Sequence, residues 1–250
     1  MKAMILAAGL GTRLRPLTNN RPKALVEISG RTLLEITLNC LRSFGIREVI
    51  INVHHHADMV TDYLEKKSNL GMRVEISREE ILLDTGGGLK RAGWFFQETP
   101  EDFERPFILH NVDVLSTIDL QQMAAFHCNH NALATLAVQD RETSRYLLFD
   151  EQDQLCGRRA GESGLPEMVR ATSTTRPLAF SGIHVISPKF LSLISEDGAF
   201  SIIDAYLRLA GNGQSIAAFR SDDSYWRDLG KPENLTEAAH DLQEGIVRLS

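Results

Sequence analysis

The first apolar run of the chain ends in a glycine loop. Residues 4–8 (MILAA) are a run short enough for a buried strand, and the chain continues as Gly9-Leu10-Gly11-Thr12-Arg13. Glycines that follow a strand let the backbone turn tightly and let its N–H groups approach an anion. Three further cations, Arg15, Arg21 and Lys23, follow within a few positions. A plain strand-to-loop turn would explain the glycines alone, but glycines and cations together favour a polyanion site.

Two common glycine loops are excluded by position. A dinucleotide-binding fingerprint needs a third glycine at position 14, where this chain has Leu14. An ATPase-type phosphate loop needs Gly-Lys-Ser or Gly-Lys-Thr at its end, and this chain has neither there. The missing third glycine therefore argues against a redox enzyme on a Rossmann-like sheet.

The positive charge of the chain is concentrated around this loop. The 250 residues carry a net charge of −6, which argues against a nucleic-acid-binding protein. Residues 1–31 hold six Lys or Arg and one acid, and so carry +5, whereas the remainder carries −11. We therefore expect the basic segment to bind a small polyanion.

Cysteine usage and the N-terminus predict a cytoplasmic protein. Cys40, Cys128 and Cys156 are odd in number and far apart, which fits neither a disulfide framework nor a zinc cluster. The first residues lack the pattern of a signal peptide, and no apolar run approaches the ~18 residues of a spanning helix. We expect no membrane partner.

Alternating periodicities predict an α/β fold. Apolar runs typical of strands at 48–53, 73–76, 106–109 and 133–138 alternate with helical spacing at 31–44, 57–67, 87–96 and 120–127. This order implies crossover units, and hence a Rossmann-like, mostly parallel central sheet flanked by helices. Ligands then bind at the carboxyl ends of the strands.

The pattern of apolar and polar residues changes from residue 139 onward. Short apolar runs separated by polar and glycine-rich stretches predict a small antiparallel excursion at about 139–185, which could act as a lid. Helices are expected at 201–209 and 233–242, with a strand at 216–219 between them. The economical interpretation is a single domain over residues 1–250.

The motifs of the first loop resemble a known family. LAAGLGTRLRPLT (residues 6–18) followed by RPKAL (21–25) is similar to the signature of the sugar-1-phosphate nucleotidyltransferases, which make nucleotide sugars. The resemblance implies that the loop wraps a nucleoside triphosphate and that Arg13 and Lys23 hold its phosphates. The nucleotide-binding residues it implies are Leu6, Ala7, Ala8, Gly9, Gly11, Thr12, Arg13, Lys23, Thr85, Gly86, Gly87 and Asn111.

Two aspartates resemble the metal ligands of that family. Asp113 follows an apolar run and Asp228 follows an aromatic one, and each taken alone is equally compatible with a turn or helix-cap carboxylate. The resemblance implies that both bind Mg²⁺ and act with Arg13 and Lys23 as the catalytic set. The family often has glycine before the first aspartate, where this chain has Val112.

A nucleotidyl transfer explains why two carboxylates and a metal would be needed. Two unit charges ~4 Å apart repel by about 4 kcal/mol at an effective dielectric constant of ~20, and a bound Mg²⁺ relieves much of this repulsion. A sugar phosphate is already ionised, so no side chain is required as a general base. Catalysis would consist of positioning and charge stabilisation.

Two further segments resemble substrate-binding parts of the family. Asp84-Thr-Gly-Gly-Gly88 precedes an expected helix, so Thr85, Gly86 and Gly87 are nucleobase candidates, although a helix-start loop without a ligand is the alternative. Residues 180–184 are similar to the acceptor side, with Gly182 near the sugar.

Some motifs leave alternatives open. The consecutive histidines 54–56 point to alternate sides of a strand and cannot easily share one metal ion, so a polar rim near the nucleotide or a structural role is favoured. The second lysine that many longer members use to hold the sugar phosphate has no counterpart between 139 and 175. Candidates to replace it are Arg145, Arg158, Arg159 and Arg170.

The predicted reaction is Mg²⁺-dependent transfer of a nucleoside monophosphate from a nucleoside triphosphate to a sugar 1-phosphate. The short length and residues 83–88 are most similar to the N-acetylmuramate-1-phosphate uridylyltransferases of cell-wall recycling, which implies UTP and N-acetylmuramate 1-phosphate. Mannose- or heptose-1-phosphate guanylyltransferase is the nearest alternative. A non-catalytic nucleotide-sugar sensor is an alternative of a different class, and the sequence leaves the oligomeric state open.

Overall fold

Four parallel strands form the half of the molecule that contains the N-terminus. In a computed structural model, which describes residues 1–249, β1 (Ala3–Leu6) pairs in parallel with both β4 (Glu48–Val53) and β6 (Phe107–Asn111). Strand β5 (Arg73–Arg78) pairs in parallel with β4. The intervening helices are α1 (Leu33–Ser43), α2 (Ala57–Lys66) and α3 (Asp84–Ala92). The carboxyl ends of all four strands therefore lie at one edge, as the crossover pattern predicts.

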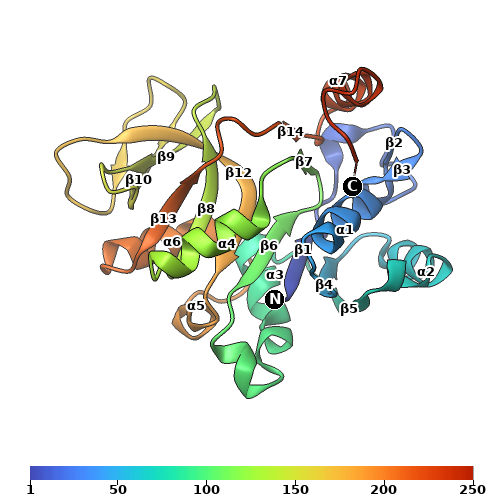
Figure 1. Ribbon diagram of the computed structural model, residues 1–250, viewed down its shortest axis with the longest axis horizontal. Coiled ribbons are helices and arrows are strands. Elements are labelled where there is room, and N and C mark those ends of the chain that lie inside the picture. The colour runs from blue at the N-terminus through green and yellow to red at the C-terminus, as the bar shows by residue number, and fades with distance from the viewer. Residues whose placement is uncertain (250) are drawn as a thin grey trace.

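An antiparallel half continues the same ten-stranded sheet (Figure 1). The strand order is β11-β10-β9-β12-β6-β1-β4-β5, with β8 paired to β12 and β13 paired to β8. The 11-residue strand β12 (Arg176–Ile186) joins the two halves because it pairs with β6, β8 and β9. The other strands of this half are β8 (Ala134–Gln139), β9 (Arg145–Phe149), β10 (Leu155–Ala160), β11 (Glu167–Met168) and β13 (Ile216–Arg220). The strands expected in the 139–185 excursion thus extend the main sheet.

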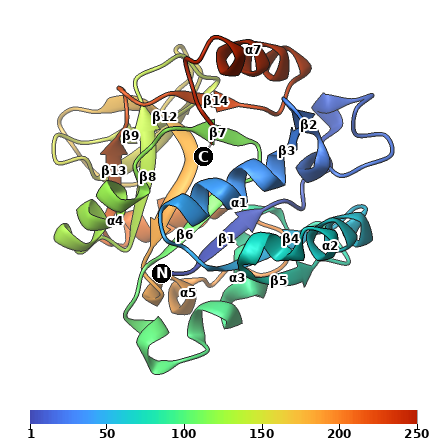
Figure 2. The ribbon, with the colours of Figure 1, turned by 45° about the vertical axis from the view of Figure 1, so that its right-hand side comes forward.

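Smaller elements surround this sheet. The remaining helices are α4 (Leu120–Asn129), α5 (Lys189–Leu193), α6 (Ile202–Gly211) and α7 (Pro232–Gln243). Short 3-10 helices are η1 (Thr12–Leu14), η2 (Lys23–Leu25), η3 (Ser68–Gly71), η4 (Gly93–Gln97) and η5 (Pro100–Phe103). Two small antiparallel sheets pair β2 (Glu27–Ile28) with β3 (Arg31–Thr32) and β7 (Val114–Ser116) with β14 (Trp226–Asp228). Figure 2 shows α7 above β14 and β7.

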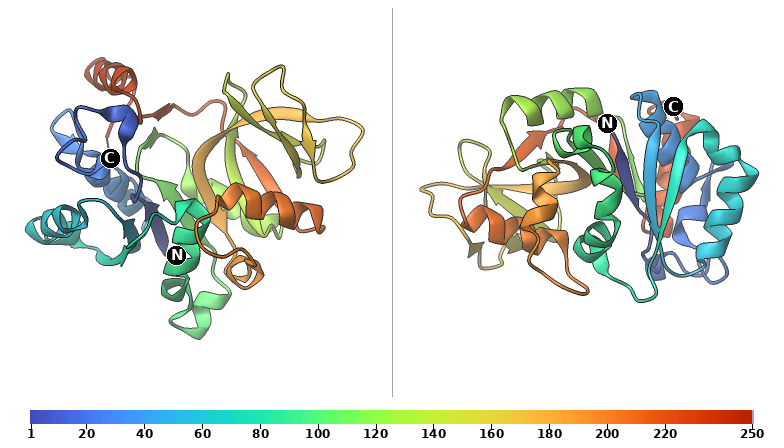
Figure 3. Two further views of the ribbon diagram at one scale, coloured as in Figure 1. Left: turned by 180° about the vertical axis from the view of Figure 1, so that it is seen from behind. Right: turned by 90° about the horizontal axis from the view of Figure 1, so that it is seen from below.

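Hydrophobic cores cover both faces of the central strands. In β1, Ala3 and Ile5 belong to the core that includes the apolar residues of α1, whereas Met4 belongs to the core shared by α3 and α6. A strand that is buried on both faces reads as a continuous apolar run, which explains why residues 4–8 and 49–51 show no alternation. Seen from behind, α3 and α6 lie on the same side of the sheet (Figure 3).

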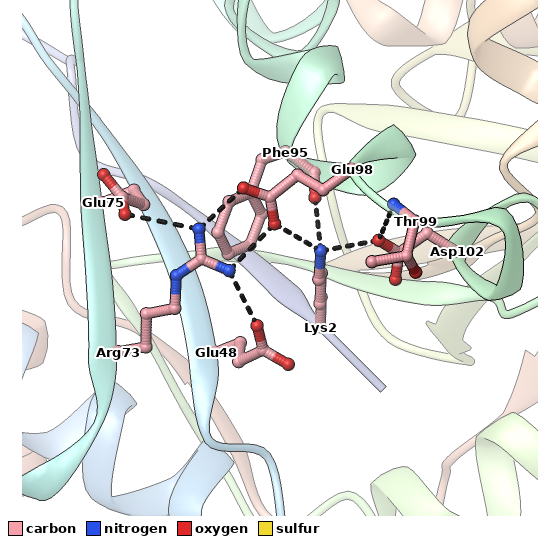
Figure 4. A network of polar contacts seen from close by, with 8 residues as sticks. All are labelled: Lys2, Glu48, Arg73, Glu75, Phe95, Glu98, Thr99 and Asp102. Carbon is pink, nitrogen blue, oxygen red and sulfur yellow. Dashed lines mark hydrogen bonds and ion pairs between the residues drawn. The ribbon is translucent and has the colours of Figure 1, made fainter.

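An ion-pair network ties together the opposite, amino-terminal edge of the strands (Figure 4). The Lys2 ammonium donates to the Phe95 carbonyl at 2.8 Å, to Glu98 at 2.7 Å and to Asp102 at 2.8 Å. Arg73, the first residue of β5, donates to Glu98 at 2.6 Å. These contacts anchor the segment of η4 and η5 to the start of the sheet, at the end remote from the expected ligand edge.

The predicted fold class is confirmed, and most expected helices and strands appear within a few residues of their predicted limits. One boundary was wrong: α3 begins at Asp84, three residues before the expected start, because the glycines themselves form its first turns. The expected helix also ends early, since residues 93–97 tighten into η4. Within residues 1–249, no helix is both long and apolar enough to cross a membrane.

Candidate active site

The glycine loop after β1 folds back on itself and carries Lys23 to the ligand edge. Gly11 has φ +63°, a conformation that L side chains rarely adopt. A Cβ at this position would lie 3.0 Å from Thr18 Cγ2 and 3.1 Å from Lys23 Cβ. The Thr18 hydroxyl donates to the Gly11 carbonyl at 2.8 Å. Gly11 is therefore required for the close packing that positions Lys23.

The two predicted metal ligands lie side by side. Asp113 follows β6, and Asp228 ends β14, which pairs with β7 so that Asp228 is opposite Val114. The Leu229 amide donates to the Asp113 carbonyl at 2.7 Å. A Cβ on Gly230 would lie 2.8 Å from Asp228 Oδ1, 3.1 Å from Asp113 Oδ2 and 2.7 Å from Arg13 Nη2. Three residues separated by 100 or more positions in the sequence thus converge around one glycine.

Both carboxylates face cations from the glycine loop. The Lys23 ammonium forms an ion pair with Asp113 Oδ2, and these side chains are only 14% and 13% exposed. Arg13 Nη1 lies 3.5 Å from Asp228 Oδ2. All four residues of the predicted catalytic set are therefore brought together at the carboxyl edge of the sheet.

The two aspartates have their pKa values shifted in opposite directions. Burial raises the pKa of Asp113, but the charge and hydrogen bond of Lys23, together with a hydrogen bond from Asp228, hold this pKa below its ordinary value. For Asp228, burial and then the negative charge of Asp113 raise the pKa. The pair titrates as a unit in which Asp228 is the group that accepts a proton first.

The donors of this pair suit Mg²⁺. Proteins usually bind Mg²⁺ through one or two carboxylates and leave the rest of its octahedron to water and substrate phosphates. Asp113 and Asp228 supply two adjacent carboxylates, and in the part of the chain that the structure describes no group of three or more His, Cys, Asp or Glu could hold a metal by itself. Oxygen atoms of a bound phosphate would complete such a site.

A buried polar link that was not among the predicted site residues fixes the start of the loop. The Ala7 amide donates to Asn52 Oδ1 at 2.7 Å, and Asn52 Nδ2 donates to Glu79 Oε1 at 2.7 Å. Glu79 also accepts from the Leu83 amide at 3.0 Å. A polar residue inside the apolar run 49–53 was the signal that could have found it, because a buried amide needs partners.

The histidine triplet contributes to this region in a structural way. His54 Nδ1 is 2.8 Å from the Glu79 carbonyl, and His56 adopts a left-handed conformation (φ 56°) at the start of α2. The ring of His55 packs at 3.8 Å from that of His56, measured between centroids. The triplet follows β4 instead of lying on it, so the strand alternation expected for it was wrong, and the His54 contact ties the end of β4 to the residue after β5.

The glycine triplet at 86–88 serves helix packing. A Cβ on Gly86 would lie 2.2 Å from the Phe200 ring, one on Gly87 would lie 2.3 Å from the Gly198 carbonyl oxygen, and one on Gly88 would lie 2.7 Å from Asn52 Nδ2.

The backbone amides of Gly86 and Gly87 and the side chain of Thr85 also bond to the start of α6 and to the segment before it. The Gly86 and Gly87 amides donate to the Phe200 carbonyl at 2.9 and 3.4 Å. The Thr85 hydroxyl accepts from the Ile202 amide at 2.9 Å. Packing against the segment before α6 therefore accounts for Gly86 and Gly87, and the Asn52–Glu79 link accounts for Gly88. A nucleobase contact at residues 85–87 stays a prediction.

A cleft of about 950 Å³ runs from the acidic pair toward the antiparallel half. Its lining includes five of the predicted site residues: Arg13, Asn111, Asp113, Gly182 and Asp228. Gly182 has φ +76°, and a Cβ there would lie 2.8 Å from Asn111 Nδ2, so it bends β12 at the cleft wall. Predicted residues outside this lining lie on β1 and its loop (Leu6, Ala7, Ala8, Gly9, Gly11, Thr12 and Lys23) and at the start of α3 (Thr85, Gly86 and Gly87).

Comparisons with known proteins identify the family of the chain. The family described as "Nucleotidyl transferase" matches residues 2–245. N-acetylmuramate alpha-1-phosphate uridylyltransferase of Caulobacter vibrioides is 32% identical, with 97% of each chain covered. The catalytic subunit beta of mannose-1-phosphate guanylyltransferase from Dictyostelium discoideum is 26% identical over 94% of this chain, which spans only 62% of that relative.

Solved structures share the fold. HddC from Yersinia pseudotuberculosis complexed with GMP-PN has a TM-score of 0.74 and 23% identity, covering 96% of this chain and 99% of its own. A UDP-glucose pyrophosphorylase complexed with UDP-glucose has a TM-score of 0.77 and 18% identity, covering 98% of both chains. At these identities the likeness establishes the fold alone.

Proposed function

The chain belongs to the nucleotidyl transferase family and is a sugar-1-phosphate nucleotidyltransferase, and we propose that it transfers uridylate from UTP to N-acetylmuramate 1-phosphate. The observation that carries the reaction is the convergence of Arg13, Lys23, Asp113 and Asp228, of which Arg13 and both aspartates line one cleft. The choice of substrates is supported by the Caulobacter uridylyltransferase, which matches this chain over nearly its whole length.

The glycine loop supplies the charge that a triphosphate requires. Arg13 and Lys23 would bind its phosphate oxygens, since both come from the loop that leaves β1 and both already face carboxylates in the cleft. Asp113 and Asp228 would hold Mg²⁺, which when bound reduces the repulsion between the two reacting phosphate groups. The Asn52–Glu79 link keeps the start of the loop in place through the Ala7 amide.

The chemistry is an in-line displacement. An oxygen of the sugar 1-phosphate forms a bond to the α-phosphorus of the triphosphate, the bond from that phosphorus to the α,β-bridging oxygen breaks, and pyrophosphate leaves. The attacking oxygen is already ionised, so no proton has to be removed. Two such anions held ~4 Å apart repel by about 4 kcal/mol at an effective dielectric constant of ~20. A barrier raised by this amount would slow the reaction roughly a thousandfold. The cations at the edge of the sheet would offset this repulsion.

Substrate choice is tested by a grid of reactions. Pyrophosphate release is measured with Mg²⁺ for UTP, GTP, CTP and dTTP against N-acetylmuramate 1-phosphate, mannose 1-phosphate and glucose 1-phosphate. We expect the pair of UTP and N-acetylmuramate 1-phosphate to be strongly preferred. A preference for GTP with mannose 1-phosphate would instead support the guanylyltransferase alternative. If folded protein that binds a triphosphate releases no pyrophosphate with any pair, a sensor would be favoured.

A further inference from the structure

The cleft carries more positive charge than the triphosphate site explains. Arg13 belongs to the glycine loop, but four more arginines line the cleft from the antiparallel half: Arg141, Arg145, Arg158 and Arg159. Of these, Arg158 is paired with Glu167 and with Asp204, both at 2.6 Å. The remaining guanidinium groups face a cleft that is expected to admit a second anionic substrate.

Arg141 is held near the acidic pair. It follows β8, and its Nη2 donates to the Phe180 carbonyl at 2.9 Å. Its guanidinium carbon lies 3.6 Å from the centroid of the Trp226 ring, a cation–π contact. Trp226 stands two residues before Asp228 on β14, and its indole donates to the Ser181 carbonyl at 2.7 Å. The guanidinium plane is therefore fixed next to the strand that carries one predicted metal ligand.

The same side chain has hydrogen-bonding capacity to spare. Arg141 Nε is buried and finds no partner among the residues that the structure describes, and the same holds for the hydroxyl of the neighbouring Ser181. A buried donor without an acceptor is unfavourable, and a guanidinium fork matches two oxygens of a phosphate. The arrangement is one that a phosphate group entering the cleft would complete.

The other arginines of this half are placed differently. Arg145 is exposed at the start of β9. Arg159 donates to the Gly161 carbonyl at 3.0 Å and lies over the Tyr146 ring, within the antiparallel strands. Arg170 does not belong to the cleft lining. Arg141 is thus the arginine of this half whose contacts lead directly to the acidic pair.

We propose that Arg141 binds the phosphate group of the sugar 1-phosphate and orients it toward the α-phosphorus of the triphosphate. This inference rests on the proposed function, because it needs a sugar 1-phosphate as the second substrate. It assigns the acceptor phosphate to a residue that the sequence did not single out. Arg141 also explains how the chain can dispense with a lysine between 139 and 175.

The test compares Arg141→Gln and Arg141→Lys with the wild type. Arg176→Gln is the matched control, because Arg176 is also an arginine of the antiparallel half, pairs with Asp153 at 2.6 Å and lies outside the cleft lining. For Arg141→Gln we expect the KM for N-acetylmuramate 1-phosphate to rise by about 10- to 100-fold while the KM for UTP changes by less than about twofold. Arg141→Lys should recover part of the loss, and the control should behave as the wild type.

A binding measurement separates phosphate recognition from a structural role. Calorimetry with N-acetylmuramate 1-phosphate and with unphosphorylated N-acetylmuramate should show a preference for the phosphate in the wild type that Arg141→Gln loses. In Arg141→Gln, an unchanged KM for the sugar phosphate, or equal rises in both KM values, would overturn the inference. The proposed function would stand, because it depends on turnover by the wild type. Wild-type protein that neither binds nor converts any of the three sugar 1-phosphates would overturn the proposed function as well.

Discussion

The ammonium group of Lys23 is paired with the carboxylate of Asp113, so a predicted phosphate ligand and a predicted metal ligand neutralise each other. Without substrate, this pair allows both charges to be buried at the edge of the sheet. Binding of Mg²⁺ and a triphosphate would exchange the partners: Asp113 would turn to the metal and Lys23 to a phosphate oxygen. Substitutions of Lys23 and of the two aspartates should therefore change both metal binding and stability.

Asparagine substitutions of the two aspartates should affect stability in opposite directions. Asp113→Asn leaves the buried Lys23 ammonium unpaired and should lower the free energy of unfolding by about 1–3 kcal/mol. Asp228 has a raised pKa, so ionisation of Asp228 in the folded protein lowers the free energy of unfolding as pH rises through that pKa. Asp228→Asn removes this loss. At pH 8 without metal, we expect Asp113→Asn to melt below the wild type and Asp228→Asn above it.

Both variants should nevertheless lose activity by orders of magnitude in a pyrophosphate-release assay, because each removes a proposed metal ligand. Matching decreases in melting temperature would contradict the opposed shifts in pKa. Near-normal turnover in either variant would remove that aspartate from the site.

Replacing Lys23 should uncouple metal binding from catalysis. Lys23→Met removes the cation that competes for Asp113, so Mn²⁺ used as a probe without nucleotide should bind several-fold more tightly than to the wild type. Turnover should fall, since the triphosphate loses a cation. Lys23→Arg is the control. It keeps the positive charge, so it should bind Mn²⁺ more weakly than Lys23→Met does. Weaker Mn²⁺ binding by Lys23→Met would show that the pair does not compete with the metal.

The pH dependence of metal binding should follow Asp228. Its pKa lies above the ordinary value of 3.8, so on acidification Asp228 takes up a proton while Asp113 is still ionised. Mn²⁺ affinity should therefore fall as pH is lowered through the pKa of Asp228. Carboxyl carbon NMR of Asp228 gives the midpoint directly, and Asp113→Asn should move it downward because a neighbouring negative charge is removed. A wild-type midpoint at or below 3.8 would contradict this electrostatic arrangement.

The network around Lys2 predicts how the fold responds to acid. Hydrogen bonds from Arg73 and then from Lys2 lower the pKa of Glu98 from 4.5 to about 2. A lowered carboxyl pKa adds stability that is present above 4.5 and is lost as pH falls toward 2. Glu98→Gln should flatten the change in melting temperature within this interval and leave turnover at pH 8 unchanged. Wild-type and variant curves of the same slope would show that the network does not contribute to acid stability.

Local patterns predicted the elements, because they depend on residues close together in the chain. The glycine loop, the crossover units and the positions of Asp113 and Asp228 all follow from short stretches of sequence. What the sequence could not supply is pairing at long range. Strands β7 and β14 are three residues each and pair Ser116 with Trp226, so neither has a periodic pattern of its own. That small sheet is what places the two aspartates side by side.

The same limit applies to the glycines and to Arg141. The run 86–88 indicated a ligand contact, yet the space that a Cβ would need is filled by Phe200, Gly198 and Asn52, residues that only the fold brings there. Arg141 is one of many arginines in the sequence, and its contact with Trp226 joins positions 85 residues apart. Its contact with Trp226 and its place in the cleft lining distinguish it from the other arginines, and neither can be read from spacing.

Nucleotidyl transfer is tested by identifying the products formed from UTP and N-acetylmuramate 1-phosphate with Mg²⁺. Mass spectrometry and phosphorus NMR should show UDP-N-acetylmuramate and pyrophosphate in equal amounts, and added pyrophosphate should reverse the reaction. Asp113→Asn and Asp228→Asn should form neither product at a comparable rate. Release of orthophosphate in place of pyrophosphate, or no nucleotide sugar from any pair in the grid, would contradict the assignment of this cleft to nucleotidyl transfer.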